Sequence, residues 1–511
     1  MKAGKSSNRI FHPFAVIGFL ALVAGCATVK VPPSQICEFE FPFMGDYDIV
    51  NRARFGWDDS FVTNNPAEYH HELAGPLACL AASTYGSRLF MDTRSLMDLG
   101  IPPERLLRCY EDNGILKYQH PKYGRDVAGF TIGSRRCEIP GEDFEIVFVA
   151  VRGTVGLEDW LSNLNMANEW GSQTNLNLAT LPKYHEGFRK AAEFVTDALE
   201  YYVKEYQIDL SKAKILVTGH SRGAAAANLI GKLLDDAADN PEETRFAGLK
   251  RGNIYCYSIA TPNVTIRESP DTKDPKYNNI YSIVSAEDLV PLIPFAEWGS
   301  ARYGRTLILK SWSTIFWGGS YFHPGYVGMK NNFKDIVGYE YWHMLWGTYL
   351  IKRVPEYVMK IAPTVAHYYY VNPEMRADGN TTSTHSFFEM VLWKNIPKST
   401  DPLRHCSLMG DIQHFADAYE QLTNTDLKQA ARKEHWDHKL RFLRPKQDDD
   451  GPFNPDGRDF SRQPGIGDFV WKVTCMHAPA TYISWMKSGV DHGPDYIYDN
   501  WDEVFEEDSN D

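Results

Sequence analysis

The sequence has no excess of basic residues: 53 Lys and Arg stand against 66 Asp and Glu, and the formal net charge is −13. A nucleic-acid-binding surface neutralises phosphates with lysine and arginine, so this composition argues against a nucleic-acid partner. Hydrophobic residues make up 43% of the chain and charged residues 23%, as in an ordinary globular protein. The 511 residues suffice for one domain of about 250 residues with insertions, or for two domains.

The sequence also lacks the cysteine and histidine spacings of metal sites. None of its eight cysteines forms a C-x-x-C pair, and the adjacent His70 and His71 would point in different directions on a helix. We therefore expect no metal. If Cys26 carries a lipid, seven cysteines remain and at least one stays free. Their pairing cannot be read from the sequence.

No internal repeat is visible, and the apolar run at residues 14–24 is too short to span a bilayer. Basic residues precede this run, and small residues lead from it to Cys26, a pattern that resembles a bacterial lipobox. The resemblance implies a lipoprotein signal peptide at residues 1–25, lipid attachment to Cys26 and membrane anchoring in the bacterial cell envelope. Ala27 resembles an outer-membrane sorting signal if the source is Gram-negative. The alternative is an ordinary secretory signal.

The most informative stretch is Gly-His-Ser-Arg-Gly, residues 219–223. An apolar run, Ile215–Val217, precedes it, and a helix that begins with small residues follows. A serine at such a sharp strand-to-helix turn takes up a strained backbone, and its hydroxyl stands above the sheet beside a helix N-terminus. The five-residue pattern alone is weak, but this context is what a nucleophilic serine needs. We therefore predict Ser221 as an acyl-transfer nucleophile.

Strand and helix patterns alternate along the middle of the chain, which favours a mostly parallel α/β sheet flanked by helices. One strand run is apolar on both faces, as in a strand buried between two helix layers. The expected strands are 126–134, 145–152, 214–219, 253–259 and 280–285, and the expected helices are 68–85, 185–205 and 222–236.

A nucleophilic serine needs an orienting acid, a base and an oxyanion hole. The acid candidate is Asp288, just beyond the last of these strands, with Glu287 as the neighbour most easily mistaken for it. The expected oxyanion donors are an amide of the segment 151–154, at the end of the strand 145–152, and the backbone amide of Arg222, and the Thr154 hydroxyl could add a third.

Together, Arg152-Gly153-Thr154, Asp159-Trp160, the turn at 219–223 and Asp288-Leu289-Val290-Pro291 resemble the class 3 lipase family. The resemblance spans residues 68–294. It implies an α/β-hydrolase fold, Ser221 as nucleophile, Asp288 as acid, and Thr154 with Arg222 as oxyanion donors. It also implies hydrolysis of carboxylic esters of lipids by a triacylglycerol lipase, phospholipase or esterase, without a cofactor.

The base is less well defined by the sequence. In the resembled family it often stands in H-x-x-x-x-Y, and two histidines here have that spacing: His477 with Tyr482, and His414 with Tyr419. We predict His477, because a proline turn and an apolar helix follow it, whereas His414 lies in an apparent helix interior. The remaining candidates are His323, His343, His367, His385 and His405.

The predicted organisation is a signal peptide (1–25), a tether and N-terminal extension (26–60) and a hydrolase core (61–294). There follow an aromatic-rich, mainly helical insertion or lid (295–465), a return to the core with the catalytic histidine (466–490) and an acidic tail (491–511). The alternative function is a catalytically inactive binding or scaffold lipoprotein on the same fold.

Overall fold

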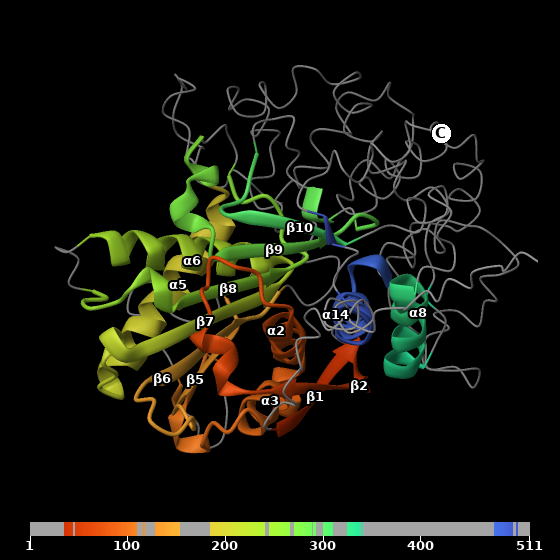
Figure 1. Ribbon diagram of the computed structural model, residues 1–511, viewed down its shortest axis with the longest axis horizontal. Helices are drawn as coiled ribbons and strands as arrows, with labels where there is room; N and C mark the ends of the chain where they lie inside the picture. Colours follow the sequence, from red (N-terminus) through yellow and green to blue (C-terminus); the bar gives the residue numbers. More distant parts are fainter. Residues whose placement is uncertain are drawn as a thin grey trace, which may run out of the picture.

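The chain folds around a mostly parallel sheet with helices on both faces (Figure 1). Within the residues described, nine strands form this sheet in the order β11-β10-β9-β8-β7-β6-β5-β3-β4, and two more form a separate hairpin. The structure is a computed structural model. It describes residues 35–43, 46–109, 116–117, 128–153, 184–240, 245–265, 270–288, 290–292, 300–309, 324–338, 341, 475–493 and 497–498.

The centre of the sheet is parallel and antiparallel pairs flank it on both sides, while the outermost pair at one end is parallel again. The parallel strands are β6 (Glu145–Val151), β7 (Ala213–His220), β8 (Ile254–Ile259), β9 (Ile280–Ser285) and β10 (Arg305–Leu309). At one end β5 (Phe130–Arg136) runs antiparallel to β6, followed by β3 (Leu106–Arg108) and β4 (Leu116–Lys117). At the other end β11 (Ile497–Tyr498) pairs antiparallel with β10.

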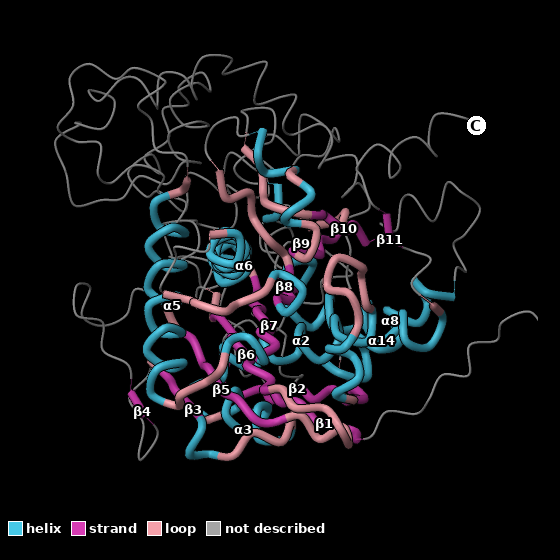
Figure 2. Tube along the Cα trace, turned by 60° about the vertical axis from the view of Figure 1, so that its left-hand side comes forward, coloured by secondary structure: helices cyan, strands magenta, loops and turns pink. Residues whose placement is uncertain are grey.

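Helices cover both faces (Figure 2). One face carries α5 (Glu186–Glu205) and α6 (Arg222–Asp239), and the other carries α2 (His71–Ser83) and α14 (Pro479–His492). The helix α8 (Pro324–Val337) packs against α14, and α3 (Met91–Asp98) packs near the hairpin. Short 3-10 helices are η1 (Asp59–Thr63), η2 (Thr84–Leu89), η3 (Pro103–Arg105), η5 (Leu210–Lys212), η6 (Arg251–Asn253), η7 (Pro270–Lys273), η8 (Pro275–Tyr277) and η9 (Val290–Leu292).

The central strands are buried on both faces because successive side chains point to opposite sides of a strand. In β7, Ile215 and Val217 join the core cluster beneath α5 and α6. Thr218, whose side chain points to the opposite face of the strand, donates its hydroxyl proton to the Leu77 carbonyl of α2 at 3.0 Å. This double burial explains the continuous apolar runs of the sequence.

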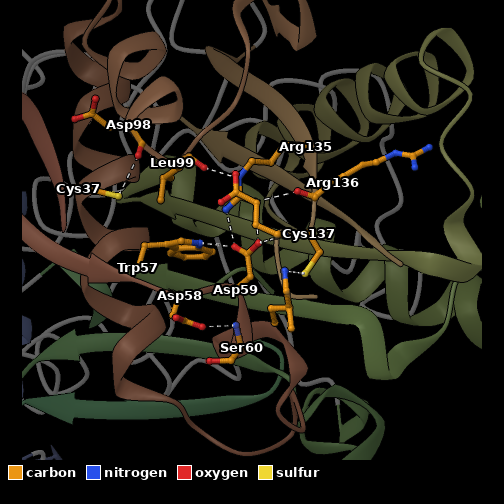
Figure 3. A network of polar contacts seen from close by, with 12 residues as sticks. Cys37, Trp57, Asp58, Asp59, Ser60, Asp98, Leu99, Arg135, Arg136 and Cys137 are labelled. Carbon is orange, nitrogen blue, oxygen red and sulfur yellow. Dashed lines mark hydrogen bonds and ion pairs between the residues drawn. The ribbon is translucent and has the colours of Figure 1, made fainter. Parts of the chain in front are cut away.

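The hairpin of β1 (Gln35–Phe43) and β2 (Asp46–Trp57) packs on α2 and α3. A buried ion pair beside its end ties it to β5: both Arg135 Nη atoms donate to the Asp59 carboxylate, at 2.6 and 2.8 Å (Figure 3). The Trp57 indole and the Glu138 amide also donate to Asp59. Burial acts to raise the pKa of Asp59, but these hydrogen bonds outweigh it and lower the pKa. The hairpin is thus part of the fold.

The strands and helices predicted from the sequence are confirmed, with shifted ends: β5 begins at Phe130 and α2 at His71. The sheet extends past two predicted boundaries. Strand β10 lies inside the range 295–465 assigned to the insertion, and β11 lies inside the range 491–511 assigned to the tail. The signal peptide and most of the insertion lie outside the described residues. None of the helices that are described could cross a bilayer.

Candidate active site

Ser221 occupies the turn between β7 and α6 in a strained conformation. Its φ of 58° and ψ of −126° lie in a region that side-chain-bearing residues rarely adopt. Its amide donates to the Ile259 carbonyl of the neighbouring strand at 3.0 Å, which holds the turn in place. Strain of this kind persists only where surrounding contacts fix it, and it is common at functional sites.

The two glycines of the motif are required by crowding. A Cβ on Gly219 would collide with the backbone of Gly223, and one on Gly223 would collide with the Val151 carbonyl of β6. A Cβ on Gly153 would lie 2.6 Å from the His220 carbonyl. Side chains are therefore excluded where the turn meets the end of β6, and the parallel register of Val151 with Gly219 brings these segments together.

Asp288 and His477 meet in the folded chain. His477 Nδ1 lies 2.8 Å from Asp288 Oδ2, and the two side chains are 4% and 0% exposed. The Asp288 carboxylate also accepts the Val290 amide on Oδ1 at 3.0 Å. Asp288 follows the carboxyl end of β9, the edge at which parallel sheets gather site residues. The pair has the geometry of an imidazole oriented by a carboxylate.

Tyr482 adds a second donor to this carboxylate. Its hydroxyl donates to Asp288 Oδ2 at 2.6 Å and accepts the Ser285 amide at 3.0 Å. Burial, followed by the negative charge of Asp288, raises the pKa of Tyr482, so the phenol stays protonated and keeps donating. The H-x-x-x-x-Y spacing thus places the tyrosine one helical turn into α14, where its hydroxyl reaches the acid.

Glu287, the neighbour of Asp288, points to a different partner. It is 3% exposed, and it accepts the Tyr341 hydroxyl on Oε2 at 2.7 Å. The two adjacent buried carboxylates therefore accept hydrogen bonds from different tyrosines, Glu287 from Tyr341 and Asp288 from Tyr482. The arrangement separates the two residues that the sequence left easiest to confuse.

A buried arginine links the loop after β8 to the segment after Asp288. Arg302 donates to the Thr261 carbonyl at 2.6 Å, to Asn263 Oδ1 at 3.1 Å and to the Pro291 carbonyl at 2.6 Å. Complete burial lowers its pKa to about 10, which leaves the guanidinium charged at neutral pH. Arg302 therefore braces the turn that carries the acid, a role that no local sequence pattern signals.

His220 and Tyr85 are also part of this neighbourhood, and sequence reasoning missed both. The rings of His220 and His477 lie 4.8 Å apart between centroids, and His220 Nε2 lies 2.9 Å from the His477 carbonyl oxygen. The Tyr85 hydroxyl lies 2.8 Å from His220 Nδ1. His220 lies inside the serine motif itself, but its partners come from distant helices.

The remaining predicted site residues divide into two groups. Arg222 is the first residue of α6, next to Ser221, so its amide belongs to the positive end of that helix. Outside the described residues lie Thr154, Cys26, His414 and the alternative bases His323, His343, His367, His385 and His405. Across the part of the chain that the structure describes, no cluster of three His, Cys, Asp or Glu side chains could hold a metal ion.

Residues 148–298 match the family model for lipase (class 3). The matched segment contains the end of β6, the Ser221 turn and Asp288, and it ends well before His477. The match confirms the resemblance drawn from the sequence, and the sheet topology confirms an α/β-hydrolase fold. The chain is accordingly a lipase-like serine hydrolase, with carboxylic esters as its substrate class.

The chain also matches solved structures of lipases from Rhizomucor and Rhizopus. The native Rhizomucor miehei lipase propeptide complex is 18% identical, over 57% of this chain and 81% of that one, with a TM-score of 0.32. Lipase II from Rhizopus niveus is 18% identical, over 50% of this chain and 81% of that one, with a TM-score of 0.31. The lipase from Rhizopus microsporus var. chinensis is 18% identical, over 49% and 74%, with a TM-score of 0.29.

Proposed function

We propose that the protein is an exported, lipid-anchored serine hydrolase that cleaves carboxylic esters of lipids through Ser221, His477 and Asp288. The observation that carries this proposal is the 2.8 Å contact between His477 Nδ1 and Asp288 Oδ2. It lies beside the strained Ser221 turn, to which His477 is linked through the hydrogen bond from His220. A serine, an imidazole and a carboxylate in this order form the machinery of acyl transfer.

In the proposed reaction, His477 Nε2 takes the proton of the Ser221 hydroxyl as Oγ attacks the ester carbonyl. Asp288 accepts a hydrogen bond from Nδ1, so the proton-accepting nitrogen of the neutral ring is Nε2. The imidazolium then returns the proton to the leaving alcohol, and the acyl group stays on Oγ. Water, deprotonated by the same nitrogen, then attacks the acyl group, and the imidazolium returns the proton to Oγ as the carboxylic acid leaves, which regenerates the serine.

The tetrahedral intermediate carries a negative charge that backbone amides can stabilise. We assign this role to the Arg222 amide, at the N-terminus of α6, and to Thr154, which follows β6. The Arg222 assignment is supported by its place directly after Ser221. The Thr154 assignment is supported by the contact of Gly153 with the turn.

The substrate class follows from the class 3 lipase match, which implies a lipid ester: a triacylglycerol, a phospholipid or a simpler ester. The lipobox-like sequence before Cys26 supports export and membrane anchoring in the bacterial cell envelope, on the outer membrane if the cell is Gram-negative. An anchored enzyme would meet its substrate at a lipid surface. Profiling activity against esters of increasing acyl length, and against phospholipids, would distinguish the three activities.

A fluorophosphonate probe tests the proposal, because it labels only an activated serine. We expect wild-type protein to be labelled at Ser221, and the Ser221→Ala variant to be unlabelled. The Ser83→Ala variant is the matched control, since it removes a buried serine hydroxyl that only donates to the Leu80 carbonyl within α2. A folded wild-type protein without labelling or ester hydrolysis would instead support the inactive binding or scaffold lipoprotein.

A further inference from the structure

A chain of two hydrogen bonds runs from η2 to the backbone of His477. The Tyr85 hydroxyl lies 2.8 Å from His220 Nδ1, and His220 Nε2 lies 2.9 Å from the His477 carbonyl oxygen. All members are buried: Tyr85 is 4% exposed, His220 1% and His477 3%. The chain joins three segments that are separated by 135 and 257 positions in the sequence.

The direction of both hydrogen bonds follows from the groups involved. A backbone carbonyl oxygen only accepts, so His220 Nε2 carries the proton and donates to His477. Burial, followed by the nearby His477 ring, holds the pKa of His220 well below its usual range, so the ring is neutral. Nδ1 is therefore an acceptor, and the Tyr85 hydroxyl donates to it. Burial also raises the pKa of Tyr85, which keeps this donor protonated.

The same tyrosine contacts the segment that precedes Thr154. A Cβ on Gly153 would collide with the Tyr85 hydroxyl and would lie 2.6 Å from the His220 carbonyl oxygen. Gly153, Tyr85 and His220 are therefore packed without room for a further methyl group. The Tyr85 hydroxyl thus lies between the end of β6 and the imidazole of His220.

We infer that Tyr85 and His220 are positioning residues, which fix the His477 backbone and hence its imidazole relative to Ser221 and the Gly153 segment. This inference rests on the proposed function, in which His477 is the base. Ser221 is itself bonded in sequence to His220, so one residue links the nucleophile and the base. A displacement of the base by about 1 Å can lower turnover by about 100-fold, so such a link has a measurable effect.

Three substitutions test the two hydrogen bonds separately. Tyr85→Phe removes the donor to Nδ1, and His220→Leu removes both bonds. His220→Gln keeps an N–H near the position of Nε2, and so keeps the donor to the His477 carbonyl. The matched control is Tyr255→Phe, because Tyr255 is equally buried and its hydroxyl donates to the Val62 carbonyl at 2.6 Å, away from the Ser221 turn.

The measurements are kcat and KM for a soluble ester, the rate of fluorophosphonate labelling, and the midpoint of thermal unfolding. We expect Tyr85→Phe and His220→Leu to lower kcat by about 10- to 100-fold with little change in KM, since the proposed reaction gives these two residues no contact with substrate. His220→Gln keeps one of the two hydrogen bonds, so its kcat should lie above that of His220→Leu and close to that of Tyr85→Phe. Tyr255→Phe should lower the unfolding midpoint as Tyr85→Phe does, but keep the wild-type kcat.

The inference is wrong if Tyr85→Phe and His220→Leu keep the kcat of the Tyr255→Phe control, or if His220→Gln is as impaired as His220→Leu. If His220→Leu fails to fold, Tyr85→Phe and His220→Gln decide the outcome. An inactive and unlabelled wild-type protein would overturn the proposed function and this inference with it. An active, labelled wild type with unaffected variants would overturn the inference alone.

Discussion

His477 Nδ1 lies 2.8 Å from Asp288 Oδ2, although 189 positions separate the two residues. The contact is possible because α14 returns to the sheet and packs on α2, the helix that also contacts β7. Asp288 is fully buried and accepts two further hydrogen bonds, from Tyr482 and from the Val290 amide. The carboxylate is therefore held firmly enough to orient an imidazole.

Removal of the nucleophile should abolish turnover without unfolding the protein. We expect Ser221→Ala to lower kcat by about 10⁴- to 10⁶-fold, because members of a catalytic triad act as a unit. We expect an alanine at position 221 to keep the strained φ of 58°, so the midpoint of thermal unfolding should change little. Ester hydrolysis and circular dichroism on the same preparation test both expectations. Activity above a tenth of wild type would assign the nucleophile elsewhere.

The two adjacent carboxylates should respond differently to loss of charge. We expect Asp288→Asn to lower kcat by about 10⁴-fold, because an amide can donate to His477 Nδ1 and so favour the wrong tautomer. Glu287→Gln keeps an oxygen that can accept the Tyr341 hydroxyl, so its kcat should stay close to wild type. The steady-state kcat of the two variants tests which carboxylate is the catalytic acid. The reverse order of impairment would identify Glu287 as the acid.

Substitution of the two histidines with the H-x-x-x-x-Y spacing should also affect kcat to different extents. His477→Ala should lower kcat about as much as Ser221→Ala, since either loss disables proton transfer. His414→Ala should leave turnover largely intact. Initial rates of ester hydrolysis at pH 8 provide the comparison. A severe loss in His414→Ala with an active His477→Ala would transfer the role of base to His414.

Buried Asp235 should make stability depend on pH. Burial raises its pKa to about 8 in the folded state, against about 3.9 in an unfolded chain. The contribution of Asp235 to the free energy of unfolding is fully present below about pH 4. It is lost as the pH rises towards 8, by up to about 1.4 kcal/mol per pH unit. Asp235→Asn keeps an oxygen for Asn279 Nδ2 and removes the titration. Urea unfolding should therefore show the variant gaining stability relative to wild type between pH 5 and pH 8. An unchanged difference between the two proteins would contradict this assignment.

The N-terminal prediction is tested at Cys26. Cys26→Ser cannot form the thioether of a lipid-modified cysteine, so the variant should stay unprocessed or become soluble. Stable anchoring needs more than one acyl chain, so partial modification would also weaken membrane binding. Detergent-phase partitioning and the mass of the mature chain test this. Identical partitioning and identical mass for variant and wild type would rule out the lipobox.

The alternation of strands and helices could be predicted because each element carries its own local pattern. The run Ile146–Val151, apolar on both faces, became β6, the apolar run before Ser221 became β7, and the small residues after it became α6. The positions of Ser221 and Asp288 followed from local motifs at the ends of strands. The additional strands β10 and β11 could not be predicted from local motifs, because they are short and are stabilised by pairing with a partner distant in the sequence.

By itself, the sequence determined which residues could do the chemistry: a serine in a turn that only flanking glycines allow, an acid after a strand, and two histidines with equal spacing to a tyrosine. Only the tertiary structure brought His477 to Asp288, directed Glu287 to Tyr341, and joined Tyr85 through His220 to the His477 carbonyl. The physical reason is the separation in sequence between the residues that make each contact. Turns and helices follow from neighbours along the chain, whereas contacts across 189 or 257 positions depend on how helices and sheet pack together.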